Sequence, residues 1–238
     1  MSIYDYPVYF FLLAGSVLSI IGRKLTFAGA TTGALVGLLI FKGAGYTGIA
    51  MLALFFIAGS GATAWQVSKK QQLGVAESNK GKRTMGQVLA NGGIAAMLGA
   101  IAWLLPQQNA IVQVMIAGSL AAATADTLAS ELGSIYGRRF FDIITLKKSP
   151  PGPNGVVSIE GTLIGIAGAA LIALVYALGF GFNQLFFIII IAGAIGNLFD
   201  SVLGATLERR NLIGNNLVNF LNTAVGALVC YLMTLAIK

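Results

Sequence analysis

The chain has 238 residues, of which 57% are hydrophobic and only 10% are charged. Soluble domains carry about 25% charged residues, so this composition excludes a soluble enzyme as well as a disordered chain. The sequence has no His and one Cys, which excludes Ser–His–Asp triads, His-ligated zinc sites and an intrachain disulfide. The net charge of +7 alone would suit nucleic-acid binding, but the hydropathy favours a membrane protein, and we expect no nucleic-acid partner.

Eight apolar segments approach the length of about 20 residues that a helix needs to cross a bilayer. They are residues 7–22, 25–41, 46–67, 86–105, 110–133, 159–179, 184–203 and 217–237. The first two are short, so seven spans are an alternative. The sequence therefore predicts an all-α fold, a polytopic membrane helix bundle of about eight spans that forms a single transmembrane domain over residues 1–238. Glycines at helical spacing inside the spans predict close helix packing.

The basic residues are distributed unevenly between the two sides that eight spans would create. Only Lys42 and Lys238 fall on one side. The other side receives Arg23, Lys24, Lys69, Lys70, Lys80, Lys82, Arg83, Arg138, Arg139, Lys147, Lys148, Arg209 and Arg210. Cytoplasmic connections are enriched in Lys and Arg, so both termini are predicted to lie outside. We expect an integral protein of a cytoplasmic or inner membrane with its active-site loops in the cytoplasm.

Most of the acidic residues lie in or beside the cytoplasmic halves of the predicted spans. Asp126 and Glu131 lie in the fifth span, Glu160 begins the sixth, and Asp200 ends the seventh. Carboxylates at membrane depth are costly to bury, which makes them candidate functional groups. The alternative for each of them is a structural ion pair with a neighbouring Lys or Arg.

Polar residues at helical spacing occur on four of the predicted spans. Asp126 and Ser130 share one face of the fifth span, and Asn91 follows Gln87 by one turn in the fourth. The small and polar residues near Asp200 and at the start of the last span are Gly193, Gly196, Asn197, Gly204, Asn215, Asn219 and Asn222. These faces predict one interface rich in oxygen ligands, which Mg²⁺ prefers; amides that only link helices are the alternative.

The connection between the fifth and sixth spans combines basic, proline and glycine residues. Lys147 and Lys148 supply positive charge, and Gly155 leaves backbone N–H groups free to face an anion. Ser158 is predicted to cap the sixth helix, whose N-terminus carries partial positive charge. Together these features predict a phosphate-binding loop without a Walker motif. A basic loop held by lipid headgroups is the alternative.

Five sequence blocks resemble one integral-membrane family, long of unknown function, that includes plant phytyl-phosphate kinase and animal transmembrane protein nineteen. They are 87–93 (QVLANGG), 125–133 (ADTLASELG), 153–158 (PNGVVS), 160–162 (EGT) and 200–207 (DSVLGATL). The chain departs from the family pattern at Leu128, Val156 and Glu208. These differences concern the details of the predicted pocket and not membership of the family.

A looser resemblance extends to enzymes that use CTP. Asp126, Lys148-Ser149-Pro150 and Glu160-Gly161 are similar to the CTP-binding region of phosphatidate cytidylyltransferases and dolichol kinases. Residues 196–201 are similar to the metal-binding segment of the cytidylyltransferases.

The resemblance implies an isoprenoid monophosphate kinase. Such an enzyme would transfer a phosphoryl group from a nucleoside triphosphate, CTP or another, to a prenyl or phytyl phosphate in the membrane lipid, with Mg²⁺ as cofactor. The acceptor's tail would lie between glycine-rich helices. We expect Asp126 and Asp200 to bind the metal, assisted by Glu131 or Glu160. The residues expected to hold the phosphates are Lys147, Lys148, Ser149, Asn154, Gly155, Ser158, Arg138, Arg209, Asn91 and Asn219.

Two other functions remain alternatives to the kinase. A lipid cytidylyltransferase would use the same site but release pyrophosphate. A transporter of an anionic or lipid-linked substrate would also use intramembrane carboxylates and spans interrupted by glycine. The crowding of polar groups on one side of the membrane argues against transport. The sequence does not indicate which oligomeric state the protein adopts.

Overall fold

The computed structural model of the protein describes residues 5–76 and 81–237, so Lys80 and Lys238 lie outside the described residues. The helices are α1 (Tyr6–Ile21), α2 (Phe27–Ala64), α3 (Val67–Gln72), α4 (Met85–Leu104), α5 (Asn109–Tyr136), α6 (Ile159–Phe180), α7 (Leu185–Leu203) and α8 (Asn215–Ala236). A 3₁₀ turn, η3 (Pro106–Gln108), precedes α5, and a π-helical turn, η4 (Gly204–Glu208), extends α7. The only regular strands in the described residues, β1 (Phe140–Asp142) and β2 (Val156–Ser158), pair antiparallel between α5 and α6.

The expectation of a polytopic helical membrane protein is confirmed, and two of the predicted spans are joined in one kinked helix. Six helices in the described residues are long and apolar enough to cross a membrane, and α1 is a shorter apolar helix. The second and third predicted spans, 25–41 and 46–67, correspond to the two segments of the 38-residue helix α2. The predicted break between them is reduced to a kink at Gly45, whose φ of 59° and ψ of −150° are not helical.

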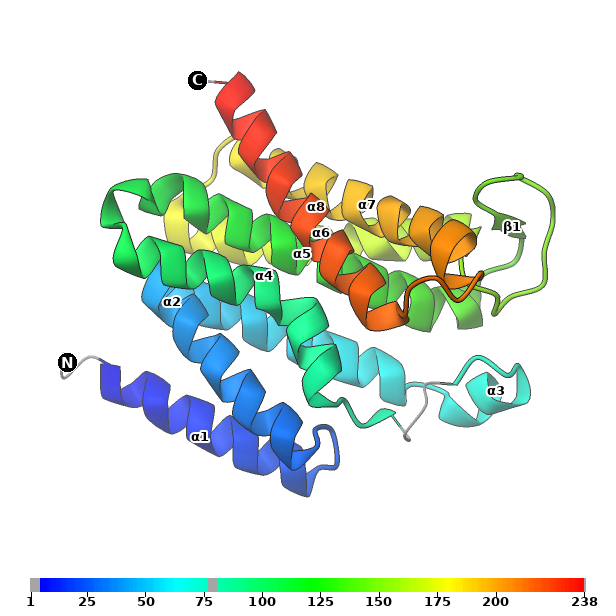
Figure 1. Ribbon diagram of the computed structural model, residues 1–238, viewed down its shortest axis with the longest axis horizontal. Coiled ribbons are helices and arrows are strands. Elements are labelled where there is room, and N and C mark those ends of the chain that lie inside the picture. Colours follow the sequence, from blue (N-terminus) through cyan, green and yellow to red (C-terminus); the bar gives the residue numbers. More distant parts are fainter. Residues whose placement is uncertain (1–4, 77–80, 238) are drawn as a thin grey trace.

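The bend at Gly45 changes the direction of α2. The left-handed φ value is one that glycine adopts without the steric cost that other residues have. Figure 1 shows the segment before the bend, in blue, and the segment after it, in cyan, running in different directions. A straight helix of this length would extend about 57 Å, nearly twice the thickness of a bilayer's hydrocarbon core. The bend therefore lets α2 pack along the bundle instead of projecting from it.

Helix α5 occupies the centre of the bundle and contacts α2, α4, α6, α7 and α8. Its close contact with α6 depends on small residues: a Cβ atom added at Gly133 would lie 2.8 Å from the Cα of Gly161. At the next turns of α6, Gly165 and Gly168 also face α5. The predicted role of these glycines in close helix packing is confirmed, and it brings the polar face of α5 next to its neighbours.

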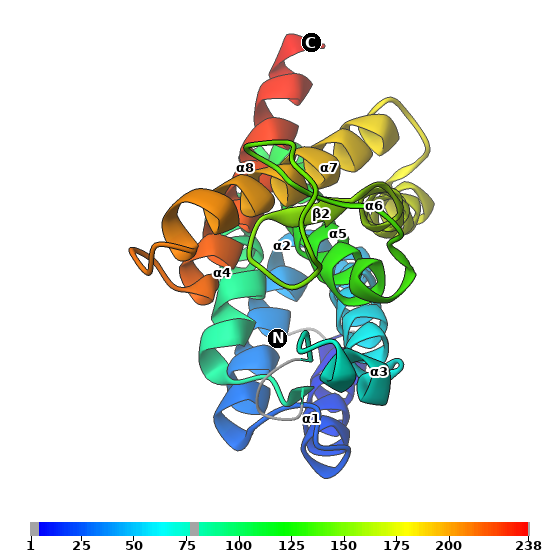
Figure 2. The same cartoon turned by 90° about the vertical axis from the view of Figure 1, so that its right-hand side faces the viewer.

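The longer connections lie together at one end of the bundle. Figure 1 shows α3 and the β1 segment at the same end, and Figure 2 looks onto that end, where the strands pass in front of the helices. Two helices that begin there, α4 and α6, have side-chain caps. Thr84 and Gln87 form a capping box at the start of α4, and the Ser158 hydroxyl accepts a hydrogen bond from the Gly161 N–H at 3.0 Å, as predicted for α6.

Candidate functional site

A polar cavity of about 290 Å³ lies at the end of the bundle that carries the longer connections. Its walls come from α4, α5, α7 with η4, the starts of α6 and α8, and the loop that ends in β2. The polar residues in its lining are Arg83, Gln87, Asn91, Asp126, Thr127, Ser130, Glu131, Ser134, Asn154, Ser158, Thr162, Asn197, Asp200, Ser201, Glu208, Asn215 and Asn219. The structure thus brings together the polar faces of four helices that the sequence predicted to meet.

Two carboxylates from different helices meet in this cavity. Asp126 on α5 and Asp200 on α7 are close enough to hydrogen-bond to one another. Glu208 of η4 is a third carboxylate, and its charge interacts unfavourably with the charges of both. Carboxylates at this distance repel each other, and a shared proton or a bound cation relieves the repulsion. The pair is the most concentrated negative charge in the cavity.

Two polar atoms in the cavity lining are left without partners. The Oδ2 atom of Asp200 and the Oδ1 atom of Asn91 are buried and form no hydrogen bond within the described part of the chain. Buried polar atoms are nearly always paired, so unpaired ones at a cavity indicate a ligand, an ion or water. Oxygen atoms dominate the set, as a hard cation requires.

The donor set fits Mg²⁺ in one particular way. Among residues 5–76 and 81–237, no three His, Cys, Asp or Glu side chains gather as a complete metal site. Mg²⁺, however, commonly binds through one or two carboxylates together with waters and substrate phosphates. Asp126 and Asp200 fit that mode.

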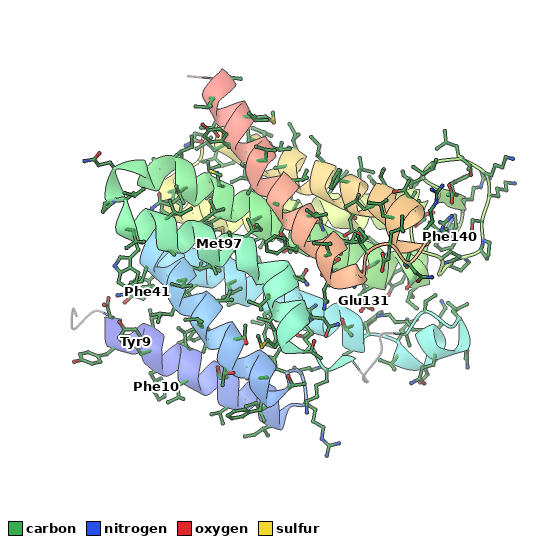
Figure 3. All side chains as sticks on the ribbon, viewed as in Figure 1. Tyr9, Phe10, Phe41, Met97, Glu131 and Phe140 are labelled. Atoms are coloured by element: carbon green, nitrogen blue, oxygen red, sulfur yellow. The ribbon has the colours of Figure 1, made fainter. Side chains whose placement is uncertain are left out.

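Glu131, expected to assist the metal, borders the cavity but has partners of its own. Its Oε2 atom forms an ion pair with Lys70, and its Oε1 atom accepts a hydrogen bond from the Thr63 hydroxyl at 2.8 Å. Lys70 also donates to the carbonyl of Ala62 at 2.7 Å, near the end of α2. In Figure 3, Glu131 and Phe140 lie toward the end with the longer connections, whereas Tyr9 and Phe41 lie toward the other end. The ion pair between Lys70 and Glu131 thus links α3 and α5 to the end of α2.

Three other residues expected at the site lie outside the cavity lining. Lys147 and Lys148 are exposed, and the Ser149 hydroxyl donates to the carbonyl of Pro150 at 3.3 Å. Only the later part of the predicted phosphate loop reaches the cavity, through Asn154, Gly155 and Ser158. The lysines can attract an anion toward the opening but do not line it.

Glu160 and the two expected acceptor-binding arginines also lie outside the cavity lining. The Glu160 Oε2 atom accepts a hydrogen bond from the backbone N–H of Arg138 at 3.3 Å. Arg209 forms an ion pair with Asp142 at 2.6 Å, and it donates two hydrogen bonds to the carbonyl of Asn154. Arg209 therefore ties the loop to η4, directly behind the cavity wall.

Gly155 lets that loop approach η4 closely. Its φ of +77° lies in the left-handed region, and an added Cβ would lie 2.4 Å from the Cβ of Ala205 and 2.6 Å from the carbonyl oxygen of Ser201. No side chain fits there without moving the loop. The glycine identified from the sequence thus has a packing role as well as a place in the lining.

The contact between Asp142 and Arg209 is expected to depend on pH. Hydrogen bonds from the Thr145 N–H and from Arg209 lower the pKa of the Asp142 carboxyl from 3.8 to about 2. A lowered pKa means that the ionised carboxylate favours the docked loop at neutral pH, and this contribution is lost as the pH falls from about 4 to about 2. Hydrogen exchange of residues 142–155, corrected for intrinsic rates, should accelerate several-fold over that range.

The variant Asp142→Asn should show the faster exchange already at pH 7, while the interior of α6 stays protected. Equal exchange in the variant and the parent at pH 7 would mean that Arg209 does not hold the loop through this carboxylate.

Arg83 is a site residue that the sequence interpretation assigned only to a basic connection. It lies next to Thr84, the N-cap of α4, and it lines the cavity and acts electrostatically on Asp126. Its guanidinium carbon lies 5.2 Å from the centre of the Phe55 ring. The signal that could have identified it is the capping box, because a residue directly before a helix N-cap lies at the helix end that faces the cavity.

Comparison with known proteins identifies relatives along most of the chain. Chloroplastic protein VTE6 of Arabidopsis thaliana is 29% identical over 92% of this chain and 67% of its own length. Uncharacterized membrane proteins of Synechocystis and Methanocaldococcus jannaschii are 34% and 32% identical, over 82% and 87% of this chain and 76% and 84% of their own lengths. No solved structure matches the chain. The model of the integral membrane protein family DUF92 matches residues 10–227, and the chain belongs to that family.

Proposed function

We propose that this protein is a membrane-embedded isoprenoid monophosphate kinase that uses a nucleoside triphosphate, with CTP the favoured donor. The observation that carries the proposal is the pair formed by Asp126 and Asp200, with the unpartnered Oδ2 atom of Asp200, inside a polar cavity of an otherwise apolar bundle. A site for two phosphate compounds needs such a pair, because Mg²⁺ held by carboxylates offsets the repulsion between them. The family resemblance to phytyl-phosphate kinase supports the same reaction.

The reaction needs little more from the protein than positioning. An oxygen of the acceptor phosphate attacks the γ-phosphorus, the bond from that phosphorus to the bridging oxygen breaks, and the nucleoside diphosphate leaves with the electron pair. A phosphate monoester has its second pKa near 6, so the attacking oxygen is already ionised at neutral pH and no general base is required. This agrees with a chain that has no His.

The residues that line the cavity have different roles in this proposal. Asp126 and Asp200 would hold Mg²⁺, which when bound neutralises charge on the transferring phosphoryl group. Asn154 and Ser158 would orient the triphosphate from the loop side, while Asn91 and the amides at the start of α8 face it from the opposite helices. The loop is held in place for this task by Arg209 and Gly155.

The proposal places the cavity on the cytoplasmic side of the membrane, where nucleotides are available. The two halves of α2 run in different directions, so that together with α1 the chain would cross the membrane eight times. The connections rich in Lys and Arg then share one side with the cavity, as the positive-inside rule requires.

The test is an assay of the purified protein in lipid nanodiscs with Mg²⁺, CTP or ATP, and geranylgeranyl, phytyl or farnesyl phosphate. We expect a prenyl diphosphate together with CDP or ADP, and loss of both products when EDTA removes the metal. Formation of a CDP-lipid and pyrophosphate would replace the proposal with cytidylyl transfer. Uptake of lipid phosphate into proteoliposomes without any nucleotide consumption would replace it with transport.

A further inference from the structure

A second cavity, of about 340 Å³, lies between α1, α2 and α4 and is almost entirely apolar. Its lining includes Phe11, Leu18, Val36, Leu52, Phe55 and Phe56. α1 forms one wall of this cavity, which we call the apolar groove. α1 packs mainly against α2, and Figure 1 shows it at the edge of the bundle. The groove therefore lies at the periphery of the helices and not in the central core around α5.

The apolar groove and the polar cavity meet at three residues. Arg83, Gln87 and Asn91 line both. At this junction, Asn91 has a buried Oδ1 atom without a partner, and Arg83 supplies a positive charge within electrostatic reach of Asp126. Starting from the groove, the lining thus changes from apolar side chains to a cation and amides, and then to the carboxylate pair.

The position of Arg83 is set by its backbone and its neighbours. Its backbone carbonyl accepts a hydrogen bond from the Thr26 N–H at 3.0 Å, and its N–H donates to the carbonyl of Lys24 at 2.9 Å. Its guanidinium lies over the Phe55 ring, and the absence of a side chain at Gly59 makes room for it, since a Cβ there would be 2.7 Å from Nη2. A guanidinium held in this way suits a phosphate, which it can bind with two parallel hydrogen bonds.

We infer that this groove binds the isoprenoid chain of the acceptor and that Arg83 binds its phosphate, pointing it toward Asp126 and Asp200. The inference rests on the proposed function for the identity of the acceptor. The chemistry that the two adjoining cavities would recognise is an amphiphile with one long apolar chain and one compact anionic end. Arg83 takes the place of Arg138 and Arg209 as the acceptor's contact.

Two glycines allow the groove to be filled without disturbing the fold. A Cβ at Gly15 of α1 would have no atom within 4 Å, and one at Gly33 of α2 would meet only Leu25, at 4.0 Å. Both residues line the groove, so Gly15→Phe and Gly33→Phe should place a ring where the chain would lie. Gly61→Phe is the matched control, because Gly61 is also on α2 with nothing within 4 Å but does not line the groove.

The first experiment compares acceptors with long and short chains. We expect Gly15→Phe and Gly33→Phe to lower kcat/KM for a C20 prenyl phosphate by about tenfold or more, with no change for a C5 prenyl phosphate. The factor corresponds to the loss of about two methylene-sized contacts at about fourfold each. Gly61→Phe should match the parent with both acceptors. If the parent protein uses the C20 acceptor and neither groove variant changes its kinetics, the groove assignment is wrong while the kinase proposal stands.

The second experiment measures binding without turnover. A C20 prenyl phosphate with a terminal diazirine should crosslink to peptides of α1 and α2, and unlabelled C20 phosphate should compete whereas C20 alcohol should not. Arg83→Gln should reduce labelling about tenfold, with partial recovery in Arg83→Lys. Equal competition by the alcohol or by bilayer phospholipid would show that the groove holds an ordinary membrane lipid only. Specific labelling without nucleotide consumption would retain the groove and overturn the kinase proposal.

Discussion

Replacing Asp126 or Asp200 with Asn is expected to lower kcat for phosphoryl transfer by a factor of about 100 or more, the order of magnitude for losing one group that stabilises developing charge. Either change keeps the size of the side chain but removes a negative charge from the pair. The fold should survive, because the substitution relieves the repulsion between two neighbouring carboxylates rather than breaking an ion pair. The rate should recover only in part when Mg²⁺ is raised.

Two comparisons make the result specific to the pair. Asp5→Asn removes a carboxylate paired with Lys42 at 2.9 Å, near the N-terminus and outside the cavity, and should leave kcat unchanged. The double variant Asp126→Asn/Asp200→Asn should be little worse than either single variant, because groups that act as one unit are not additive. Full turnover in both single variants would show that the carboxylates do not take part in catalysis.

The carboxylate pair was predictable because its signal is local. Asp126 and Ser130 repeat at helical spacing, and a carboxylate in an apolar span is too costly to be placed there without a role. The same reasoning pointed to Asn91 and Asn219, and both line the cavity. Each of these residues is recognisable from its own helix alone.

Features that depend on contacts between distant segments were not predictable in this way. Residues 43–45 indicate a loop by composition, and only the structure shows that the two predicted helices join there across a kink at Gly45 alone. Glu131 lies in the same predicted span as Asp126 and was expected to assist the metal, but Lys70, 61 residues earlier in the chain, binds its carboxylate. Lys147 and Lys148 have the right charge for a phosphate loop, yet the β1–β2 pairing and Arg209 place a different part of that loop at the cavity.

The ion pair between Lys70 and Glu131 gives the largest expected effect on stability. Their side chains are 1% and 8% exposed, so removing one partner leaves a charge buried without compensation. Lys70→Met should lower the free energy of unfolding by about 3–5 kcal/mol. For a chain of this size the change corresponds to a melting temperature lower by roughly 6–20 °C, measurable by thermal unfolding in detergent. Glu131→Gln should act in the same direction.

The pair between Lys42 and Asp5 is the matched control. Its side chains are 22% and 16% exposed, so Lys42→Met should cost only about 0–1 kcal/mol. The double variant Lys70→Met/Glu131→Leu should recover most of the lost stability, because apolar residues of similar volume can replace a buried pair.

The same double variant decides between the two roles available to Glu131. If the carboxylate serves only to hold α3 and α5 against the end of α2, the double variant should keep its kcat and its dependence on Mg²⁺ once corrected for the folded fraction. A metal ligand could not be exchanged for Leu in this way: turnover would fall in every Glu131 variant, whatever its melting temperature. Asp126 and Asp200 have no cationic partner comparable to Lys70 among the described ion pairs. Among these three carboxylates, we therefore expect the loss of turnover to be confined to Asp126 and Asp200.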